Sequence, residues 1–292
     1  MPHVSRRALL GGLALFATPA LASERRIDLR AGYVPGFEAA PLFTMLGEGW
    51  PAAAGIDIAP IRFSTAAELT DALARGVVDA YWGPVSALAA GAPPARIVAG
   101  TTVEDTAVIA AGAGFARLAS DPARPMADAA VRHWLAATAR RVEIVALAGD
   151  GALDALAQGA VDAVAVREPI ATLAQARGLR AVARGAEIFP DQPAGAFALS
   201  TAFLDAHPAQ SRRLVTHAVR AERLFAADPA RAAAPVIAAL AGDLADAPIL
   251  AQALAHLRFQ PDPERLRAAA EKLGAGVPAA LIEAGPYRRL HV

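Results

Sequence analysis

A small set of aromatic, acidic and basic residues stands at the ends of apolar segments, where side chains can meet a small molecule. Tyr33, Phe37 and Glu38 follow the alternating segment that starts at Ile27. The two rings could stack on a flat ligand, and Glu38 could accept hydrogen bonds from an amine or a ring nitrogen. Core packing of Tyr33 and Phe37 is the equal alternative, because large aromatic side chains are mostly buried.

Ser64 and Thr65 stand directly before a segment with a helical pattern, residues 66–76. Backbone N–H groups in the first turn of a helix favour an anion, and the two hydroxyls add hydrogen-bond donors. Simple capping explains the same two residues, because Ser and Thr are preferred at that position. The two roles are compatible.

Trp82, Gly83 and Pro84 end an apolar segment that begins at Val77. A glycine at this place lets the backbone approach a ligand closely, and the indole offers a large apolar surface. A structural role for Trp82 in the core is the alternative.

Arg167, Glu168 and Asp150 belong to a second group of this kind. Arg167 ends the apolar segment 160–166, and a guanidinium in a closed cleft is a bidentate partner for a carboxylate, sulfonate or phosphate. Arg167 could instead pair with Glu168 or Asp150 and only hold the structure together. Asp150 also stands where the cap of the following helix is expected.

Composition excludes several classes of site. The chain of 292 residues has no cysteine, which excludes disulfides, thiolate metal sites and a cysteine nucleophile. Its six histidines show no H-x-x-x-H or H-x-H spacing, so neither a metal nor a cofactor is expected. The formal net charge is zero, and no cluster of Lys and Arg points to a nucleic acid.

The first part of the chain predicts alternating strands and helices. Strands are expected at 27–35, 56–63 and 77–82, and helices at 41–50 and 66–76. This β-α-β-α-β order favours a parallel sheet covered by helices, with right-handed crossovers.

One short unit occurs twice, as DALARGVVDA (71–80) and DALAQGAVDA (154–163), with differences at two positions only. In each copy a glycine, Gly76 or Gly159, stops a helix, and a buried strand follows. Two α/β lobes with one sheet each explain the repeat, and their facing strand ends would line a cleft. A chance match in an Ala-rich sequence is the alternative.

The last part of the chain reads as helical. Leu214, Ala218, Ala221 and Phe225 form one apolar face, and no strong strand pattern follows Leu199. We expect these C-terminal helices to pack behind the first lobe.

The N-terminus predicts an export signal peptide, residues 1–22. Arg6 and Arg7 precede an apolar run, 8–17, and Ala20-Leu21-Ala22 has the small-x-small form of a cleavage site. The run is too short to cross a bilayer, which needs about 20 residues. The paired arginines fit twin-arginine export as well as the general secretory route. No cysteine follows the signal, so a periplasmic protein without a lipid anchor is expected.

Three segments together resemble the periplasmic substrate-binding proteins of the nitrate, sulfonate and taurine ABC importers. They are GYVPGFEAAPLF (32–43), STAAELTDALARGVVDAYWGP (64–84) and DGALDALAQGAVDAVAVREP (150–169). The branch that binds thiamine pyrimidine precursors shares this pattern. The resemblance covers most of residues 27–275.

This resemblance implies an α/β clamshell of two lobes, each a mostly parallel sheet flanked by helices, with two hinge crossings. Lobe one would comprise residues 27–103 and 198–292, with the C-terminal helices packed on it, and lobe two residues 104–197. A ligand would bind between the lobes and close them. The closed monomer would then dock on a membrane permease without inserting into the membrane itself.

The chain departs from that family's pattern in two places. Residues 112–142 look abbreviated and irregular, where the family has a strand and a Ser/Thr-rich loop; the loop here would be 120–124. Arg167 stands where family members often carry an aromatic residue before Glu-Pro.

The resemblance therefore favours a solute-binding protein that is not an enzyme. Arg167, Arg124 and the helix N-termini favour an organic anion such as a sulfonate or carboxylate, whereas the aromatic residues and Glu38 favour a nitrogen heterocycle such as a thiamine pyrimidine precursor. Two other functions compete: an enzyme on the same fold, and a sensor lobe that presents its ligand to a membrane receptor. A pyridoxal enzyme needs a lysine in the cleft, and Lys272 belongs to the C-terminal helices.

Overall fold

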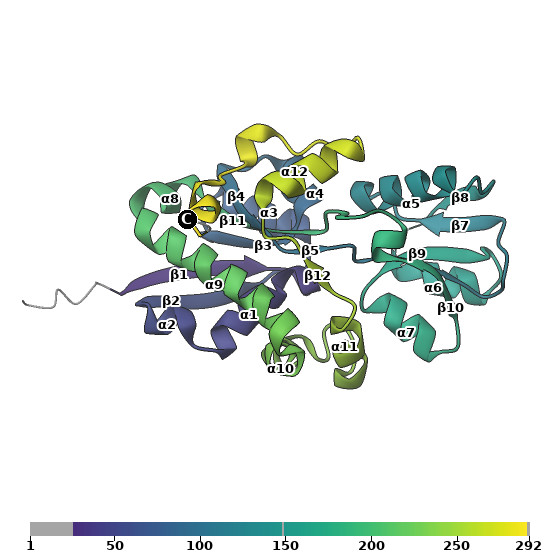
Figure 1. Ribbon diagram of the computed structural model, residues 1–292, viewed down its shortest axis with the longest axis horizontal. Helices are drawn as coiled ribbons and strands as arrows, with labels where there is room; N and C mark the ends of the chain where they lie inside the picture. Colours follow the sequence, from purple (N-terminus) through teal and green to yellow (C-terminus); the bar gives the residue numbers. More distant parts are fainter. Residues whose placement is uncertain (1–25, 148, 291–292) are drawn as a thin grey trace, which may run out of the picture.

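Two sheets covered by helices form two lobes that lie side by side along the long axis of the molecule (Figure 1). The computed structural model describes residues 26–147 and 149–290. The first sheet has the strand order β2-β1-β3-β11-β4 and the second the order β10-β6-β9-β7-β8. The strands of the first sheet are β1 (Ile27–Tyr33), β2 (Ile56–Arg62), β3 (Ala80–Pro84), β4 (Ala95–Gly100) and β11 (Gly195–Ser200). Those of the second are β6 (Thr106–Ala110), β7 (Arg117–Ser120), β8 (Glu143–Ala146), β9 (Ala163–Arg167) and β10 (Arg180–Arg184).

Each sheet is mixed for the same topological reason. β1 pairs in parallel with β2 and β3, as the β-α-β-α-β pattern predicts, and β7 pairs in parallel with β8 and β9. The strand that follows each crossing between the lobes, β6 or β11, runs the other way. β11 is antiparallel to β3 and β4, and β6 is antiparallel to β9 and β10.

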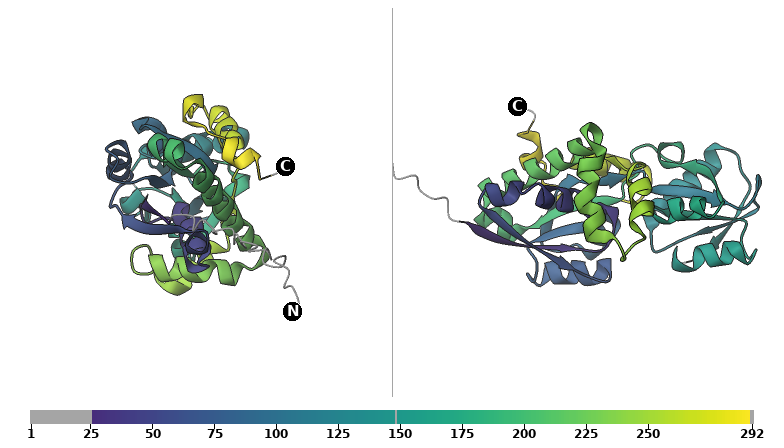
Figure 2. Two further views of the ribbon diagram at one scale, coloured as in Figure 1. Left: turned by 90° about the vertical axis from the view of Figure 1, so that its left-hand side faces the viewer. Right: turned by 90° about the horizontal axis from the view of Figure 1, so that it is seen from below.

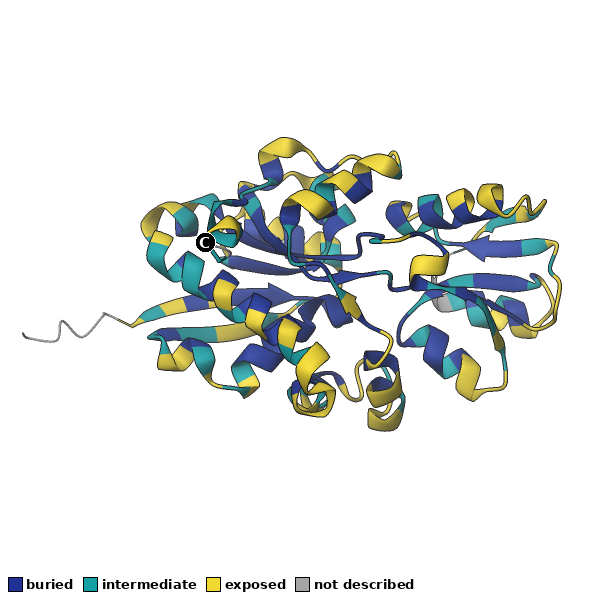
Figure 3. Ribbon diagram, viewed as in Figure 1, coloured by how far each residue is buried: buried dark blue, intermediate teal, exposed yellow. Residues whose placement is uncertain are grey.

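Helices cover both faces of each sheet, and the central strands between them are buried, whereas the edge strands β2, β8 and β10 are partly exposed (Figure 3). Trp82, Phe197 and Leu214 belong to the core on one face of the first sheet, and Tyr81 and Leu69 to the core on the other. The helices are α1 (Ala40–Gly47), α2 (Trp50–Ala53), α3 (Ala66–Ala74), α4 (Val85–Gly91), α5 (Pro125–Ala137), α6 (Gly149–Ala157), α7 (Ile170–Ala176), α8 (Thr201–Ala206), α9 (Pro208–Ala227), α10 (Pro229–Leu240), α11 (Ala247–Leu254), α12 (Pro263–Lys272) and α13 (Gly285–Arg288), with short 3-10 turns η1 (Phe37–Ala39), η2 (Gly185–Glu187) and η3 (Ala279–Leu281).

The repeated unit forms the same structure in both lobes. Gly76 and Gly159 follow α3 and α6 with φ of 67° and 71°, a left-handed conformation that glycine adopts at no steric cost. The aspartate that enters the next strand then binds the neighbouring strand. Asp79 accepts hydrogen bonds from the backbone N–H and guanidinium of Arg30, and Asp162 does the same with Arg117. The repeat therefore builds two equivalent α-β units, as the sequence predicts.

Two chain crossings connect the lobes (Figure 2). The outgoing crossing, residues 101–105, leads from β4 to β6, and the returning crossing, residues 188–194, leads into β11. The outgoing crossing contains β5 (Thr102–Val103), which pairs with β12 (Arg258–Phe259). β12 lies after Leu199, where the sequence shows no strong strand pattern: a two-residue strand is stabilised by this pairing and has no pattern of its own in the sequence.

The C-terminal helices pack mainly on the first lobe. Leu214 and Ala218 of α9 and Leu250 of α11 are buried in its core, as the apolar face predicts. α11 also lies against α7 of the second lobe, so this part of the chain contacts both lobes.

The expectation of an irregular segment at 112–142 is wrong. This segment contains β7, in parallel register with β8 and β9, and the thirteen-residue helix α5. Met126, Val131 and Trp134 form the buried side of α5. Together with Ala130 and Leu135 these residues have helical spacing, so the helix agrees with the local apolar pattern of the sequence.

The expected signal peptide, residues 1–22, lies outside the described residues. Among the helices that are described, none has both the length and the hydropathy that a membrane crossing requires.

We predict that Glu222 of α9 makes the free energy of unfolding depend on pH. Its side chain is buried, and neither carboxyl oxygen has a hydrogen-bond partner among the described residues. Burial raises the pKa of Glu222 well above its ordinary value. The folded protein therefore holds this proton more tightly than the unfolded chain, and the free energy of unfolding falls as the pH rises from the ordinary to the raised pKa.

Glu222→Gln removes this titration. We expect the variant to gain stability over the wild type between about pH 4 and about pH 8, by about 1.4 kcal/mol for each pH unit below the raised pKa, because the wild type alone must take up a proton to fold. Urea unfolding at both pH values measures the difference. The exposed Glu271→Gln is the matched control, and an equal gain at both pH values would contradict the titration.

Candidate ligand-binding site

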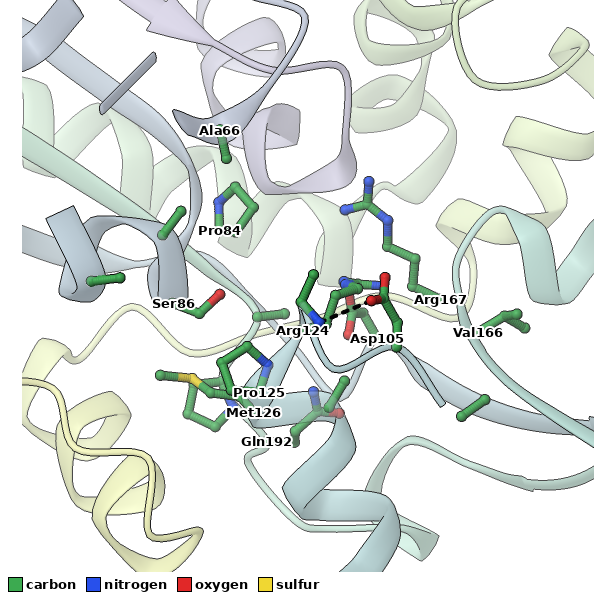
Figure 4. A pocket seen from close by; sticks show the side chains of 18 of the residues that line it. Ala66, Pro84, Ser86, Asp105, Arg124, Pro125, Met126, Val166, Arg167 and Gln192 are labelled. Atoms are coloured by element: carbon green, nitrogen blue, oxygen red, sulfur yellow. Dashed lines mark hydrogen bonds and ion pairs between the residues drawn. The ribbon is translucent and has the colours of Figure 1, made fainter. Parts of the chain in front are cut away.

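A cavity of about 520 Å³ lies between the two lobes and is lined by both (Figure 4). Pro84 and Ser86 come from the end of β3 and the start of α4 in the first lobe. Arg124 and Met126 come from the β7–α5 connection and the start of α5, and Arg167 from the end of β9. The site therefore lies where the carboxyl ends of the central parallel strands meet, which is the usual ligand position in open α/β sheets.

Two arginine–carboxylate ion pairs lie at this site, and Asp121, Ser86 and Gln192 add to its polar lining. Arg124 donates to Asp105 of the outgoing crossing at 3.3 Å (Figure 4). Arg167 donates from Nη1 to Oε1 of Glu38 at 2.7 Å. Glu38 belongs to η1 of the first lobe, so this second pair crosses the cleft. Its charges cancel, and both pairs together are neutral.

Burial and neighbouring charges act on the pKa of Arg124 in both directions. Burial, and next to it the positive charge of Arg167, lower the pKa of Arg124, while Asp105 and Glu38 act in the opposite direction. A guanidinium remains charged in proteins even so. Two cations at one cavity wall favour an anion between them, because each is only partly hydrated there.

The structure brings together some of the residues singled out in the sequence. Pro84 and Arg167 line the cavity, and Glu38 reaches Arg167. Thr65 caps α3 by accepting from the Glu68 N–H, and Ser64 N–H donates to the Glu68 carboxylate; both are exposed residues beside the cavity-lining Ala66.

Other candidates lie behind the wall of the cavity. Tyr33, Phe37 and Trp82 belong to the core of the first lobe, and Trp82 stacks on Phe197 with ring centroids 4.1 Å apart. Gly83 is buried in β3. Since side chains alternate along a strand, the residues at the end of β3 face the sheet's covering layers before the chain turns into the cleft.

Glu168 has a set of partners inside the second lobe. Its carboxylate accepts from the backbone N–H and the hydroxyl of Thr172 and from Arg184. Burial raises the pKa of Glu168, and these partners act against that rise. The side chain of Asp150 lies outside the described residues.

Sequence reasoning did not single out Asp105, Met126 and Gln192, which also line the cavity. Asp105 and Gln192 belong to the crossings, which carry no local motif. Met126 was hidden in the segment expected to be irregular.

A family model described as the NMT1-like family matches residues 22–241. The chain belongs to the NMT1-like family. No curated protein sequence matches it. Solved structures with a similar fold include the alkanesulfonate-binding protein SsuA of Xanthomonas axonopodis pv. citri bound to MOPS, with 19% identity and a TM-score of 0.65 over 89% of this chain and 99% of that one.

Two further structures are similar to this member of the NMT1-like family. The periplasmic aliphatic sulphonate-binding protein SsuA of Escherichia coli has 18% identity and a TM-score of 0.68, over 84% of this chain and 85% of that one. The periplasmic nitrate-binding protein NrtA of Synechocystis PCC 6803 has 15% identity and a TM-score of 0.63, over 90% and 92%. These likenesses confirm the two-lobed fold of periplasmic binding proteins, and each of the three neighbours is itself described as a protein that binds a sulfonate or nitrate.

Glu168→Ala tests whether Glu168 holds the second lobe together. Removing this carboxylate leaves Thr172 and Arg184 without their acceptor in a mostly buried place. We expect a loss of about 2–4 kcal/mol in the free energy of unfolding, measured by urea titration. The exposed Glu143→Ala is the control. Unchanged stability would mean that Glu168 is available for a ligand.

Proposed function

We propose that this member of the NMT1-like family captures a small organic anion, such as a sulfonate or carboxylate, between its two lobes. The observation that carries this proposal is the position of Arg124 and Arg167 at one cavity between the lobes. They come from two neighbouring strands of one sheet, β7 and β9, whose ends reach the same edge. Two guanidiniums in this arrangement match the several oxygens of an acidic group.

The rest of the cavity supports a small ligand over a large one. Its volume of about 520 Å³ is within the range of about 300–1,000 Å³ of small-molecule pockets. Ala66, Ala87, Ala90, Ala127 and Ala165 line much of it. These short side chains leave room for an aliphatic part of the ligand.

A nitrogen heterocycle is the second candidate ligand. The second oxygen of Glu38, Oε2, is buried without a hydrogen-bond partner among the described residues, and it can accept from an N–H group of a ring. No aromatic residue lines the cavity in the described part of the chain, however, because Tyr33, Phe37 and Trp82 pack in the core. A flat ring would therefore lack a stacking partner, and the anion is favoured.

Delivery to the permease of an ABC importer completes the proposal. The chain would act in the periplasm as a monomer without a lipid anchor, after removal of residues 1–22. The two-lobed fold supports this role because closure around a ligand changes the relative position of two surfaces that a membrane partner can contact. A receptor in place of a permease would use the same closure.

A thermal-shift panel on residues 23–292 tests the ligand class. The panel contains alkyl sulfonates, taurine, nitrate, carboxylates, pyrimidines and flavin fragments. A ligand at a thousandfold excess over its dissociation constant adds about 4 kcal/mol of stability, an easily measured rise in melting temperature. We expect the rise with sulfonates or carboxylates. A higher melting temperature with heterocycles alone would assign ligand binding to Glu38 in place of the arginines. An unchanged melting temperature with every compound would contradict the proposal.

Arg167→Ala is expected to abolish binding of any anion found in that panel. The variant loses one of the two guanidiniums that meet the acidic group, and a charged hydrogen-bond partner contributes about 1.5–3 kcal/mol. Titration calorimetry measures the affinity, and circular dichroism checks the fold. Arg132→Ala is the matched control, because Arg132 is exposed and pairs with Asp128 within its own helix. Unchanged affinity in Arg167→Ala would remove Arg167 from the site.

A further inference from the structure

A partly buried ion pair joins the two lobes across the cleft. Oε1 of Glu38 lies 2.7 Å from Nη1 of Arg167, and the side chain of Glu38 is 2% exposed. Glu38 comes from η1, which follows the first strand of lobe one, and Arg167 ends β9 of the second lobe. The pair therefore ties the loop after β1 to the cation that lines the cavity.

Two glycines, which have no side chain, leave room for the Glu38 side chain. A Cβ atom at Gly36 would lie 2.1 Å from Oε2 of Glu38, and a Cβ at Gly195 would lie 2.8 Å from its Cγ. Gly36 has φ of 176°, an extended conformation that any residue can adopt. The backbone does not require glycine there, so the missing side chain serves the inward position of Glu38.

Further contacts bring the lobes together beside this pair. Met126 of α5 is buried in the core on one face of the first lobe. α11 lies against α7. These contacts supply apolar area, while the Glu38–Arg167 pair supplies the directional bond at the cavity itself.

We propose that Glu38 is an internal stand-in for the acidic group of the ligand. Its carboxylate pairs with the guanidinium of Arg167, so the pair links the lobes without a ligand. An incoming anion must displace Glu38 to bind Arg167. This inference rests on the proposed function for the identity of the displacing group, but the link between the lobes does not depend on it.

This replacement of Glu38 by an anion at Arg167, called the exchange below, sets the affinity and the selectivity of the site. A carboxylate of the same chain has a high effective concentration at Arg167, so an anion that merely equals it in strength is excluded. Glu38 also has one buried oxygen, Oε2, without a partner among the described residues. The internal pair is therefore incompletely satisfied, and a sulfonate or carboxylate that also reaches Arg124 can replace it.

Distance measurements between the lobes test the link. The chain has no cysteine, so Ala67→Cys and Ala157→Cys, at exposed positions of α3 and α6, give a uniquely labelled protein for pulsed spin resonance. Without added anion we expect one short distance in this labelled protein. Glu38→Gln should add a population at longer distance, and Gly36→Ala should do so with the charge of Glu38 retained. An unchanged distance in both variants would overturn the link.

Asp191→Asn is the matched control for the loss of one carboxylate. Asp191, in the returning crossing, pairs with Arg265 of α12 in the first lobe, but both side chains are largely exposed. An exposed pair of this kind contributes little, so the distance should stay as in the wild type. A longer distance in the control as well would show a general charge effect and overturn the specific role of Glu38.

Affinity for 1-propanesulfonate tests the exchange. Glu38→Gln should bind this probe at least about tenfold more tightly than the wild type, because the competing carboxylate is gone. Equal or weaker binding by the variant would overturn the exchange and make Glu38 a residue that binds the ligand directly. If neither protein binds any anion, the proposed function fails, and the distance measurement alone decides the link between the lobes.

Discussion

The pairing of β11 between β3 and β4 is the interaction on which the rest of the structure depends. This strand returns from the second lobe and completes the middle of the first sheet, so neither lobe is independent of the crossings. Because β11 enters the sheet at the end where β3 turns into α4, the crossings lie directly under the cleft. The ends of β3 and β9 then meet at one cavity, and Pro84 and Arg167 line it from opposite lobes.

Charge balance is the second constraint on this cavity. Each of its two arginines already has a carboxylate within ion-pair distance, Asp105 for Arg124 and Glu38 for Arg167. A cavity of unpaired guanidiniums would bind many anions but would destabilise the closed arrangement by repulsion. Under the proposed exchange, this arrangement would trade affinity for selectivity, since a ligand would have to provide more than a single negative charge to replace an existing bond.

The sequence predicts the architecture well because its signals are local. Gly76 and Gly159 stop two helices, and the aspartates that follow them begin two strands in the same way. Contacts between distant segments were not predictable. Glu38 and Arg167 are far apart in the chain, and no local pattern says that one carboxylate turns inward.

Side-chain direction near the end of a strand is a further feature that the sequence does not predict. Trp82 is the third residue of β3 and packs on Phe197 in the core, whereas Arg167 is the last residue of β9 and lines the cavity. Pro84, the last residue of β3, is the position equivalent to Arg167 and lines the cavity as well, so the place within the strand decides which side chain reaches the ligand site. The expectation for 112–142 is instead a wrong interpretation of a local pattern, because the buried residues of α5 have helical spacing in the sequence.

The short ladder of β12 and β5 has a mechanical consequence for the way the lobes can move. The outgoing crossing is bonded to β12 on one edge and to the returning crossing on the other, through Ala194 N–H to Thr102 and the Val103–Pro193 bridge. It is thus the middle of a ribbon of three chains, which resists sliding and torsion of any one chain alone. A motion that separates the lobes would therefore have to bend all three paired segments together.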